Sequence, residues 1–467
     1  MQGIVGGFVK GLFAALSLLI LLSAVAAQEI DLVRAGSLDA DVLVTWSVNI
    51  TGNAKSVDTL KLVGTLVSND SRQQITEFTS SAPYKLEQQD GDMILTYQLD
   101  KPKQDNEIMT QTSVRVDYDT AELVDAQYPF TANIGYLEET NLTKTTPEMR
   151  QKAKEIVAGA NSSLEAIARM TEWVHNYVNY SLGPSKVAVP GAARGVGYGD
   201  VTLPAADVFR VREGACDEYS HLLIAMLKSQ GIPSRVATGF VSSGNAWGPH
   251  AWVEAYVPGD GWIAIDPTFN EAGLLDATHI KMASAPDQSM ISERATVFGK
   301  EDVGLLIDRN VEVRVSSVHG FGEIVSGKIN TTEMGEREEE VAVNIVNERD
   351  SPVFVPLTFV VPEGLSADRA SRMIVLGARE NRTEMFEVHL PQLEQSMIYT
   401  FPVSVRTTGT SIDAEFTRTT AVAQQTQNAS EVPGKQARQT EQPTCVLSVL
   451  LALMLVVSAV LESKDRF

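Results

Sequence analysis

The stretch that decides the fold of the central part of the chain is residues 214–227, which read GACDEYSHLLIAML. Apolar side chains recur there at spacings of three and four, the period of an amphipathic helix. These side chains are Tyr219, Leu222, Leu223, Met226 and Leu227. Gly231 and Pro233 then supply a stop signal. The pattern predicts a helix that begins at Cys216 and directs its sulfur toward the protein interior.

Cys216 is one of only two cysteines among 467 residues, and the other, Cys445, lies in an apolar run near the C-terminus. A lone thiol is either buried and inert or retained for its reactivity. The start of a helix carries a partial positive charge and free N–H groups, which favour the nucleophilic thiolate and could hold an oxyanion. Asp217 and Glu218 oppose the thiolate locally, so a second activating group is needed.

The best candidate for that group is His250, within residues 248–266, which read GPHAWVEAYVPGDGWIAID. The alternation predicts a strand, a turn and a return strand that ends at Asp266. If residues 258–260 form a three-residue loop, His250 and Asp266 are diagonal neighbours on one face. A four-residue loop would place them on opposite faces. The expected roles are Cys216 as nucleophile, His250 as base and Asp266 as the group that orients the imidazole.

These segments, in this order, resemble the core of the transglutaminase-like superfamily. The matching stretches are 214–219 (GACDEY), 231–240 (GIPSRVATGF), 250–254 (HAWVE), 261–262 (GW) and 266–268 (DPT). The resemblance covers about residues 150–280 and implies a papain-like α+β fold. It also implies that Cys216, His250 and Asp266 act as nucleophile, base and orienting residue. The side-chain oxyanion donor of animal transglutaminases has no match, and Trp173 is either a contributor or a core residue.

Such a triad would attack an amide carbonyl of a protein or peptide, form a thioester and release an amine. Water then completes a peptidase or amidase reaction, whereas a lysine amine completes protein cross-linking. We favour hydrolysis because no feature of the sequence is dedicated to a second amine. No cofactor is expected.

Other residues near these motifs have structural interpretations. His221 lies about 140° around the helix from Cys216 and faces away from it. The residues interpreted as packing or structural residues are His175, Arg235, Trp252 and Trp262. The remaining histidines, which are scattered and predict no metal site, are His279, His319 and His389.

The flanking regions alternate apolar and polar side chains, the period of half-buried strands. We predict an all-β sandwich at residues 28–140 and an immunoglobulin-like sandwich at residues 305–420. Between them, Thr146-Pro147 is a helix start and residues 163–180 form a second helix. The expected fold class is thus α+β, with a catalytic domain at residues 141–300 flanked by two sandwiches.

The two ends of the chain predict the compartment. Residues 1–27 have the pattern of a secretory signal peptide, with an uncleaved anchor as the alternative. Residues 445–461 are apolar and uncharged and predict a transmembrane helix of about 25 Å. Residues 421–443 are typical of a flexible stalk, and residues 462–467 of a cytoplasmic tail. The prediction is a single-pass protein of the cell membrane whose bulk lies outside the cytoplasm.

The charge of the chain indicates which classes of binding partner to expect. The formal net charge is −21, and an acidic surface repels phosphate backbones, so no nucleic-acid partner is expected. Asn-x-Ser/Thr sequons are compatible with exposure outside the cell and with glycosylation. They include Asn49, Asn141, Asn179, Asn330 and Asn381.

Two other classes of function stay open. The first is a cell-surface binding or structural module that keeps the fold without turnover. The second is an assembly partner that forms mixed disulfides, which a lone thiol without a resolving cysteine disfavours.

Overall fold

A computed structural model describes residues 34–420, apart from residues 90, 119–121, 133, 182–201, 244–245, 274, 292, 323 and 408. Strands dominate this part of the chain, and its α-helices all lie between residues 147 and 229. Within the described residues, no helix is both long and apolar enough to cross a membrane. The predicted signal peptide, stalk, membrane span and tail lie outside the described residues.

A first β-sandwich consists of two four-stranded sheets, with strand orders β15-β1-β6-β3 and β14-β2-β5-β4. Its strands are β1 (Ser37–Thr51), β2 (Val57–Leu66), β3 (Gln73–Ser80), β4 (Tyr84–Gln89), β5 (Asp92–Asp100), β6 (Asp105–Asp117), β14 (Arg294–Gly299) and β15 (Gly304–His319). In β1, every second side chain from Leu38 to Ile50 is buried, which confirms the period-two alternation. Burial of this stripe between the sheets holds the sandwich together.

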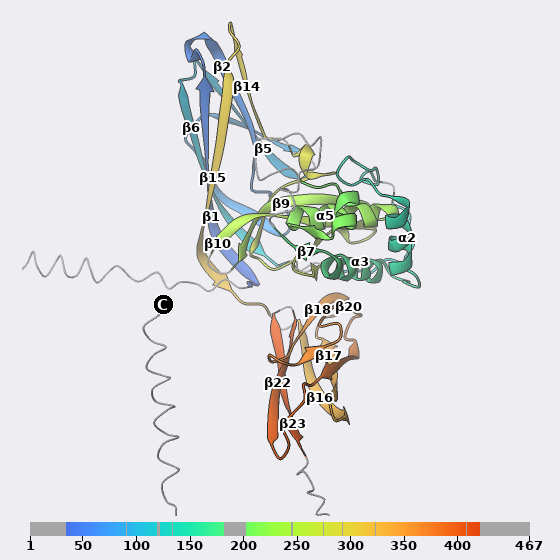
Figure 1. The fold of residues 1–467 in the computed structure, drawn as a ribbon. Coiled ribbons are helices and arrows are strands. Elements are labelled where there is room, and N and C mark those ends of the chain that lie inside the picture. The colour runs from blue at the N-terminus through green and yellow to red at the C-terminus, as the bar shows by residue number, and fades with distance from the viewer. Residues whose placement is uncertain are drawn as a thin grey trace, which may run out of the picture. The chain divides into compact units, whose positions relative to one another are not determined.

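The first sandwich includes strands that the sequence analysis assigned elsewhere. β15 pairs with β1 from Ser37 opposite His319 to Thr51 opposite Gly304, and β14 pairs with β2 (Figure 1). The predicted start of the second sandwich at residue 305 was therefore wrong. Alternation in β15 indicates a strand with one buried face but does not specify which sheet the strand joins.

The central part of the chain packs helices against an antiparallel sheet of order β12-β11-β10-β9-β13. Its strands are β9 (Ser234–Ser243), β10 (Ala246–Val257), β11 (Gly261–Asp266), β12 (Glu271–Ala272) and β13 (His279–Ala285), and its helices are α2 (Pro147–Ile156), α3 (Ser163–Tyr177), α4 (Ala205–Val211) and α5 (Cys216–Ser229). A short parallel pair, β7 (Asn179–Tyr180) with β8 (Glu213–Gly214), precedes α5. Helix α5 is buried along most of its length and contacts the other three helices, β9 and β10.

The helix starts follow from the predicted caps. The Thr146 hydroxyl accepts a hydrogen bond from the Met149 N–H at 3.2 Å, and Pro147 begins α2. Helix α3 begins at Ser163 as predicted but ends at Tyr177 rather than at residue 180. The difference has a local cause, because the Asn179 N–H donates to the Arg212 carbonyl at 2.8 Å and joins the β7–β8 pair instead.

The β10–β11 hairpin has the odd-length loop on which the site prediction depends. Its register runs from Val257 opposite Gly261 to Val253 opposite Ile265, which leaves residues 258–260 as the loop. The next residues along the two strands continue this register toward His250 and Asp266. The sequence-based register is therefore confirmed.

A second β-sandwich follows, with sheets of order β16-β17-β21-β19 and β20-β18-β22-β23. Its strands are β16 (Val325–Gly335), β17 (Glu338–Asn347), β18 (Val353–Val360), β19 (Ser366–Ala367), β20 (Ser371–Leu376), β21 (Asn381–His389), β22 (Ile398–Thr407) and β23 (Thr410–Thr419). Val341, Val343 and Ile345 alternate on β17 and are fully buried, as their period predicts. Two short 3₁₀ turns, η1 (Ala54–Ser56) and η3 (Gln288–Met290), are the remaining helical pieces of the described chain.

Candidate active site

Cys216 is the first residue of α5, in the position that the sequence predicted. The Glu218 carboxylate accepts the backbone N–H groups of Ala215 at 2.8 Å and of Leu203 at 3.0 Å, which fixes the turn into the helix. Burial, together with the charge of Asp217, raises the pKa of Glu218 to about 7. Cys216 itself is partly exposed.

Ser220 ties the first turn of α5 to strand β10. Its hydroxyl lies 2.7 Å from the carbonyl oxygen of Cys216 and 3.1 Å from that of Ala251. Ser220 is fully buried. Since Ala251 follows His250 on β10, this contact holds the start of the helix beside the histidine.

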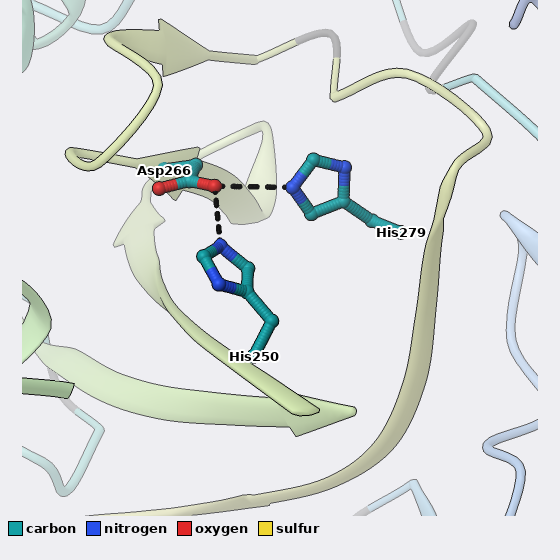
Figure 2. Close-up of side chains that lie close together, drawn as sticks. All are labelled: His250, Asp266 and His279. Atoms are coloured by element: carbon teal, nitrogen blue, oxygen red, sulfur yellow. Dashed lines mark hydrogen bonds and ion pairs between the residues drawn. The ribbon is translucent and has the colours of Figure 1, made fainter. Parts of the chain in front are cut away.

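His250 and Asp266 meet across the end of the β10–β11 hairpin. Nε2 of His250 lies 2.7 Å from Oδ2 of Asp266 (Figure 2). His250 is only 7 % exposed and Asp266 is fully buried. A buried imidazole N–H that donates to a carboxylate is strongly held in orientation, because the surroundings offer it no competing water.

The acid–base balance of this pair favours a charged imidazole. Burial alone would lower the pKa of His250, but the charge and hydrogen bond of Asp266, aided by Cys216, raise it to about 10. Burial would raise the pKa of Asp266, but the charges and hydrogen bonds of His250 and His279 hold it well below its usual range. The Cys216 side chain is among the groups that raise the pKa of His250, so it lies within interaction range of the imidazole. Because Nε2 is engaged with Asp266, Nδ1 of His250 is the nitrogen left for the thiol.

His279 is a further neighbour of Asp266 that the sequence analysis did not single out. Its Nε2 lies 3.1 Å from Oδ2 of Asp266, so two imidazoles share one carboxylate oxygen (Figure 2). The sequence gives no signal for this contact, because thirteen positions separate His279 from Asp266 and no motif links them. The interpretation of His279 as one of several scattered histidines was wrong.

Phe269 and Tyr180 bring aromatic rings to the surroundings of the pair. The Phe269 ring is 40 % exposed and stacks on His250, with 5.3 Å between ring centroids. Tyr180 is exposed, and its backbone pairs with Gly214 through β7 and β8. Partial burial of the hydroxyl, followed by the charge of Cys216, raises the pKa of Tyr180.

The other histidines of the central part contact different groups. Nε2 of His221 accepts the Gln288 N–H at 3.2 Å, in agreement with its prediction as a residue that faces away from Cys216. Nδ1 of His175 lies 3.1 Å from the carbonyl oxygen of Pro267.

Two of the residues interpreted as structural, Arg235 and Trp252, are buried, and Trp262 packs against Arg235. The Arg235 guanidinium lies 2.7 Å from Glu254 and 4.1 Å from the ring of Trp262. Trp252 is 1 % exposed. Trp173 stacks on Tyr177 with 4.1 Å between ring centroids, which favours core packing over a role as oxyanion donor.

His250, Asp266 and His279 lie close enough together to be tested as metal ligands. Both imidazoles direct Nε2 at the carboxylate rather than at a shared centre (Figure 2). Backbone N–H groups of Thr268 and Phe269 occupy the other carboxylate oxygen. The arrangement fits a hydrogen-bonded cluster rather than a coordination sphere.

A second buried group of side chains is close enough together to be tested as metal ligands, and it consists of Glu271, Asp276 and His279. Nη2 of Arg34 already lies 2.7 Å from Oε1 of Glu271. Burial and the charge of Asp276, opposed by Arg34, raise the pKa of Glu271 to about 8. A carboxyl group that keeps its proton at neutral pH is a poor metal ligand, because ligands must be deprotonated.

Comparison with known proteins matches the region that contains these residues. Residues 150–267 fit the family model of the transglutaminase-like superfamily. The chain is 33 % identical over 90 residues to "Uncharacterized protein YebA" of Bacillus subtilis, which covers 15 % of this chain and 12 % of that protein. It is 30 % identical over 96 residues to a protein-glutamine gamma-glutamyltransferase of Pseudomonas aeruginosa, which covers 18 % of this chain and 14 % of that protein. The chain thus spans only a small part of the length of either curated relative.

A solved structure of a candidate cysteine protease from Cytophaga hutchinsonii has a TM-score of 0.41 and 16 % identity to this chain, covering 62 % of this chain and 96 % of that one. The family model is the more specific finding, and it ends at Pro267, directly after Asp266. Residues 150–267 therefore form a domain that matches the transglutaminase-like superfamily, the family that the sequence motifs resemble.

Proposed function

We propose that the protein is a thiol enzyme that cleaves or transfers amide bonds of proteins or peptides through a thioester on Cys216. The observation that carries this proposal is the 2.7 Å contact between His250 and Asp266, beside a cysteine at the first position of a buried helix. His250 is the base and Asp266 orients it. The match of residues 150–267 to a superfamily of papain-like enzymes supports the same reaction class.

The first half-reaction uses the charge distribution of the pair. The Cys216 thiolate attacks the amide carbonyl carbon, and a C–S bond forms as the carbonyl oxygen takes up negative charge. The backbone N–H of Cys216, at the helix start, is available to stabilise that oxyanion. His250 then gives its proton to the departing amine as the C–N bond breaks, which leaves a thioester.

The second half-reaction depends on the acceptor. With water, neutral His250 removes a proton as oxygen attacks the thioester, and a carboxylic acid and the free thiol result. With a lysine amine, the same step yields a new amide and a protein cross-link. We favour water, because no described residue near Cys216 is evidently dedicated to binding an amine.

Acyl transfer is the second candidate, and one observation favours it. The Pseudomonas aeruginosa relative is named a protein-glutamine gamma-glutamyltransferase. The two outcomes differ in products, since hydrolysis adds one water to a substrate whereas cross-linking removes one ammonia for each bond formed.

We further propose that this enzyme is exported and tethered to the cell membrane, with the described domains outside the cytoplasm. The signal-like residues 1–27 and the uncharged apolar residues 445–461 support this location. Protease added to intact cells should digest the described domains and leave a cytoplasmic control protein intact. Protection of these domains in intact cells would contradict the proposed location.

The experiment that tests the proposed function is mass spectrometry of protein and peptide substrates incubated with the purified protein. Wild type should produce hydrolysed, deamidated or cross-linked products, and Cys216→Ala should produce none. Cys445→Ala is the matched control, because it makes the same change at the other cysteine, and it should match wild type. Equal turnover by wild type and Cys216→Ala would refute the proposal, and no turnover by either would favour the binding module.

A further inference from the structure

Among the described residues, four hydrogen-bond donors surround Asp266, and one of the four belongs to the proposed triad. Oδ1 accepts the backbone N–H groups of Thr268 at 2.8 Å and Phe269 at 3.3 Å. Oδ2 accepts Nε2 of His250 at 2.7 Å and Nε2 of His279 at 3.1 Å. Because an ionised carboxylate only accepts, His279 must carry a proton on Nε2.

The His279 ring packs against two aromatic side chains. It is fully buried at the start of β13, where its residue pairs with Val241 of β9. The ring lies edge-on to Trp252 at 5.5 Å and to Phe269 at 6.0 Å between centroids. Nε2 is directed at Asp266, as Figure 2 shows.

The opposite edge of the ring faces acidic groups. Nδ1 of His279 has no hydrogen-bond partner among the described residues and lies 3.9 Å from Oδ1 of Asp276. Glu271, which lies beside Arg34, is the other carboxyl group on that side. None of these contacts accounts for the direction of Nε2, so its bond to Asp266 is the polar contact that orients the ring.

We propose that His279 is a positioning residue whose Nε2–H pins Oδ2 of Asp266 in the orientation that His250 requires. The inference rests on the proposed function of the triad. The terminal torsion of an aspartate is broad and roughly two-fold, and without His279 the donor on Oδ2 would be His250 alone, the group that has to be oriented. A second donor fixes Oδ2 independently of His250, as second partners do for other buried functional groups.

The test measures the protonation state of the His250 imidazole as a function of pH, by NMR of the protein labelled with ¹⁵N-histidine. The chain has six histidines, so the spectrum can be assigned by substitution. In wild type, His250 should keep its proton up to about pH 10, the value to which Asp266 raises its pKa against the effect of burial. In His279→Phe, an aromatic ring remains but the N–H donor to Asp266 is lost. The pH midpoint of His250 deprotonation should then fall by about one pH unit, which is a tenfold weaker affinity of the imidazole for its proton.

Two further variants separate positioning from packing. His279→Gln keeps an N–H donor and should restore the midpoint to within about half a unit of wild type. His221→Phe makes the same change at another fully buried histidine that contacts Gln288 instead, and it should leave His250 unaffected. If His279→Phe does not fold, His279→Leu, with a smaller side chain, replaces it.

The outcomes are decisive in each direction. A midpoint that is unchanged or raised in folded His279→Phe would overturn the positioning role, and so would a His279→Gln variant that behaves like His279→Phe. Turnover adds a second readout, in which His279→Phe should lower kcat about tenfold with KM unchanged. The NMR result needs no turnover. An active Cys216→Ala variant therefore refutes the proposed function and leaves the NMR result untouched. An unchanged His250 midpoint in His279→Phe refutes the role of His279 and leaves the proposed function untouched.

Discussion

Nε2 of His250 lies 2.7 Å from Oδ2 of Asp266, although sixteen positions separate the two residues in the sequence. The three-residue loop of the β10–β11 hairpin creates this relationship, because it sets Val253 opposite Ile265. A shift of one residue in that register would turn Asp266 to the other face of the sheet. The hairpin register therefore determines whether the imidazole has an anionic partner.

Asp266→Asn should lower kcat by about 10²- to 10⁴-fold, because an amide cannot offset the charge of the His250 imidazolium. Steady-state kinetics on an amide substrate measures the change. Asp92→Asn is a matched control, since Asp92 is also buried but its carboxylate accepts the Ser284 N–H at 2.8 Å in a different region. Comparable losses of kcat in both variants would argue against a specific role for Asp266.

The His250–Asp266 pair should make stability depend on pH. The folded-state pKa of His250, raised by Asp266 against burial to about 10, exceeds its ordinary value of 6.5. Its contribution is therefore complete below pH 6.5 and is lost as the pH rises from 6.5 to about 10. Asp266 has a lowered pKa, so its contribution is present above pH 3.8 and is lost as the pH falls below that value.

Urea unfolding of wild type and His250→Leu across this range measures the effect. The difference in unfolding free energy should shrink, by on the order of 3 kcal/mol, between pH 6.5 and 10. A difference that stays flat over that interval would mean that the pair is not ionised in the folded protein.

Ser220→Ala should loosen the start of α5 from β10, because Ser220 is the hydroxyl that reaches the carbonyl oxygens of both Cys216 and Ala251. We expect a loss of about 0.5–1.5 kcal/mol in unfolding free energy and slower alkylation of Cys216. Ser229→Ala removes a similar bond, from Ser229 to the Met226 carbonyl at 2.7 Å at the far end of the helix. This control should not change the alkylation rate, and an equal decrease in both variants would refute the specific link.

Gly239→Ala should displace β13 and with it His279. A Cβ at Gly239 would lie 1.9 Å from the carbonyl oxygen of Ile280, a backbone atom that can move only with its strand. Gly248 lies on the neighbouring strand, where no atom of the described residues lies within 4 Å of such a Cβ, so Gly248→Ala is the matched control. Chemical denaturation should show a loss of about 1–3 kcal/mol in the unfolding free energy of Gly239→Ala. Similar denaturation midpoints for the two variants would contradict this packing.

Much of the candidate site was predictable because short-range patterns determine it. The spacing of apolar residues after Cys216 sets the start of α5, and an odd-length loop sets the face on which His250 meets Asp266. Both are local features of fewer than twenty residues.

The parts that were not predicted depend on long-range pairing. His279 begins β13 at the far edge of the sheet from β11, yet its ring reaches Asp266. Similarly, the alternation in β15 does not reveal that the strand pairs with β1. Such contacts depend on how the chain crosses over after Asp266 and on sheet curvature, which residue spacing does not encode.

The most direct test of the central claim is the alkylation rate of Cys216 by iodoacetamide at pH 6, followed by mass spectrometry of its peptide. If His250 is a charged partner held by Asp266, wild type should react about 10²-fold faster than His250→Ala, because the partner maintains the thiolate where an ordinary thiol is protonated. Equal rates in the two proteins would contradict an activated thiol, and with it the case for catalysis at Cys216.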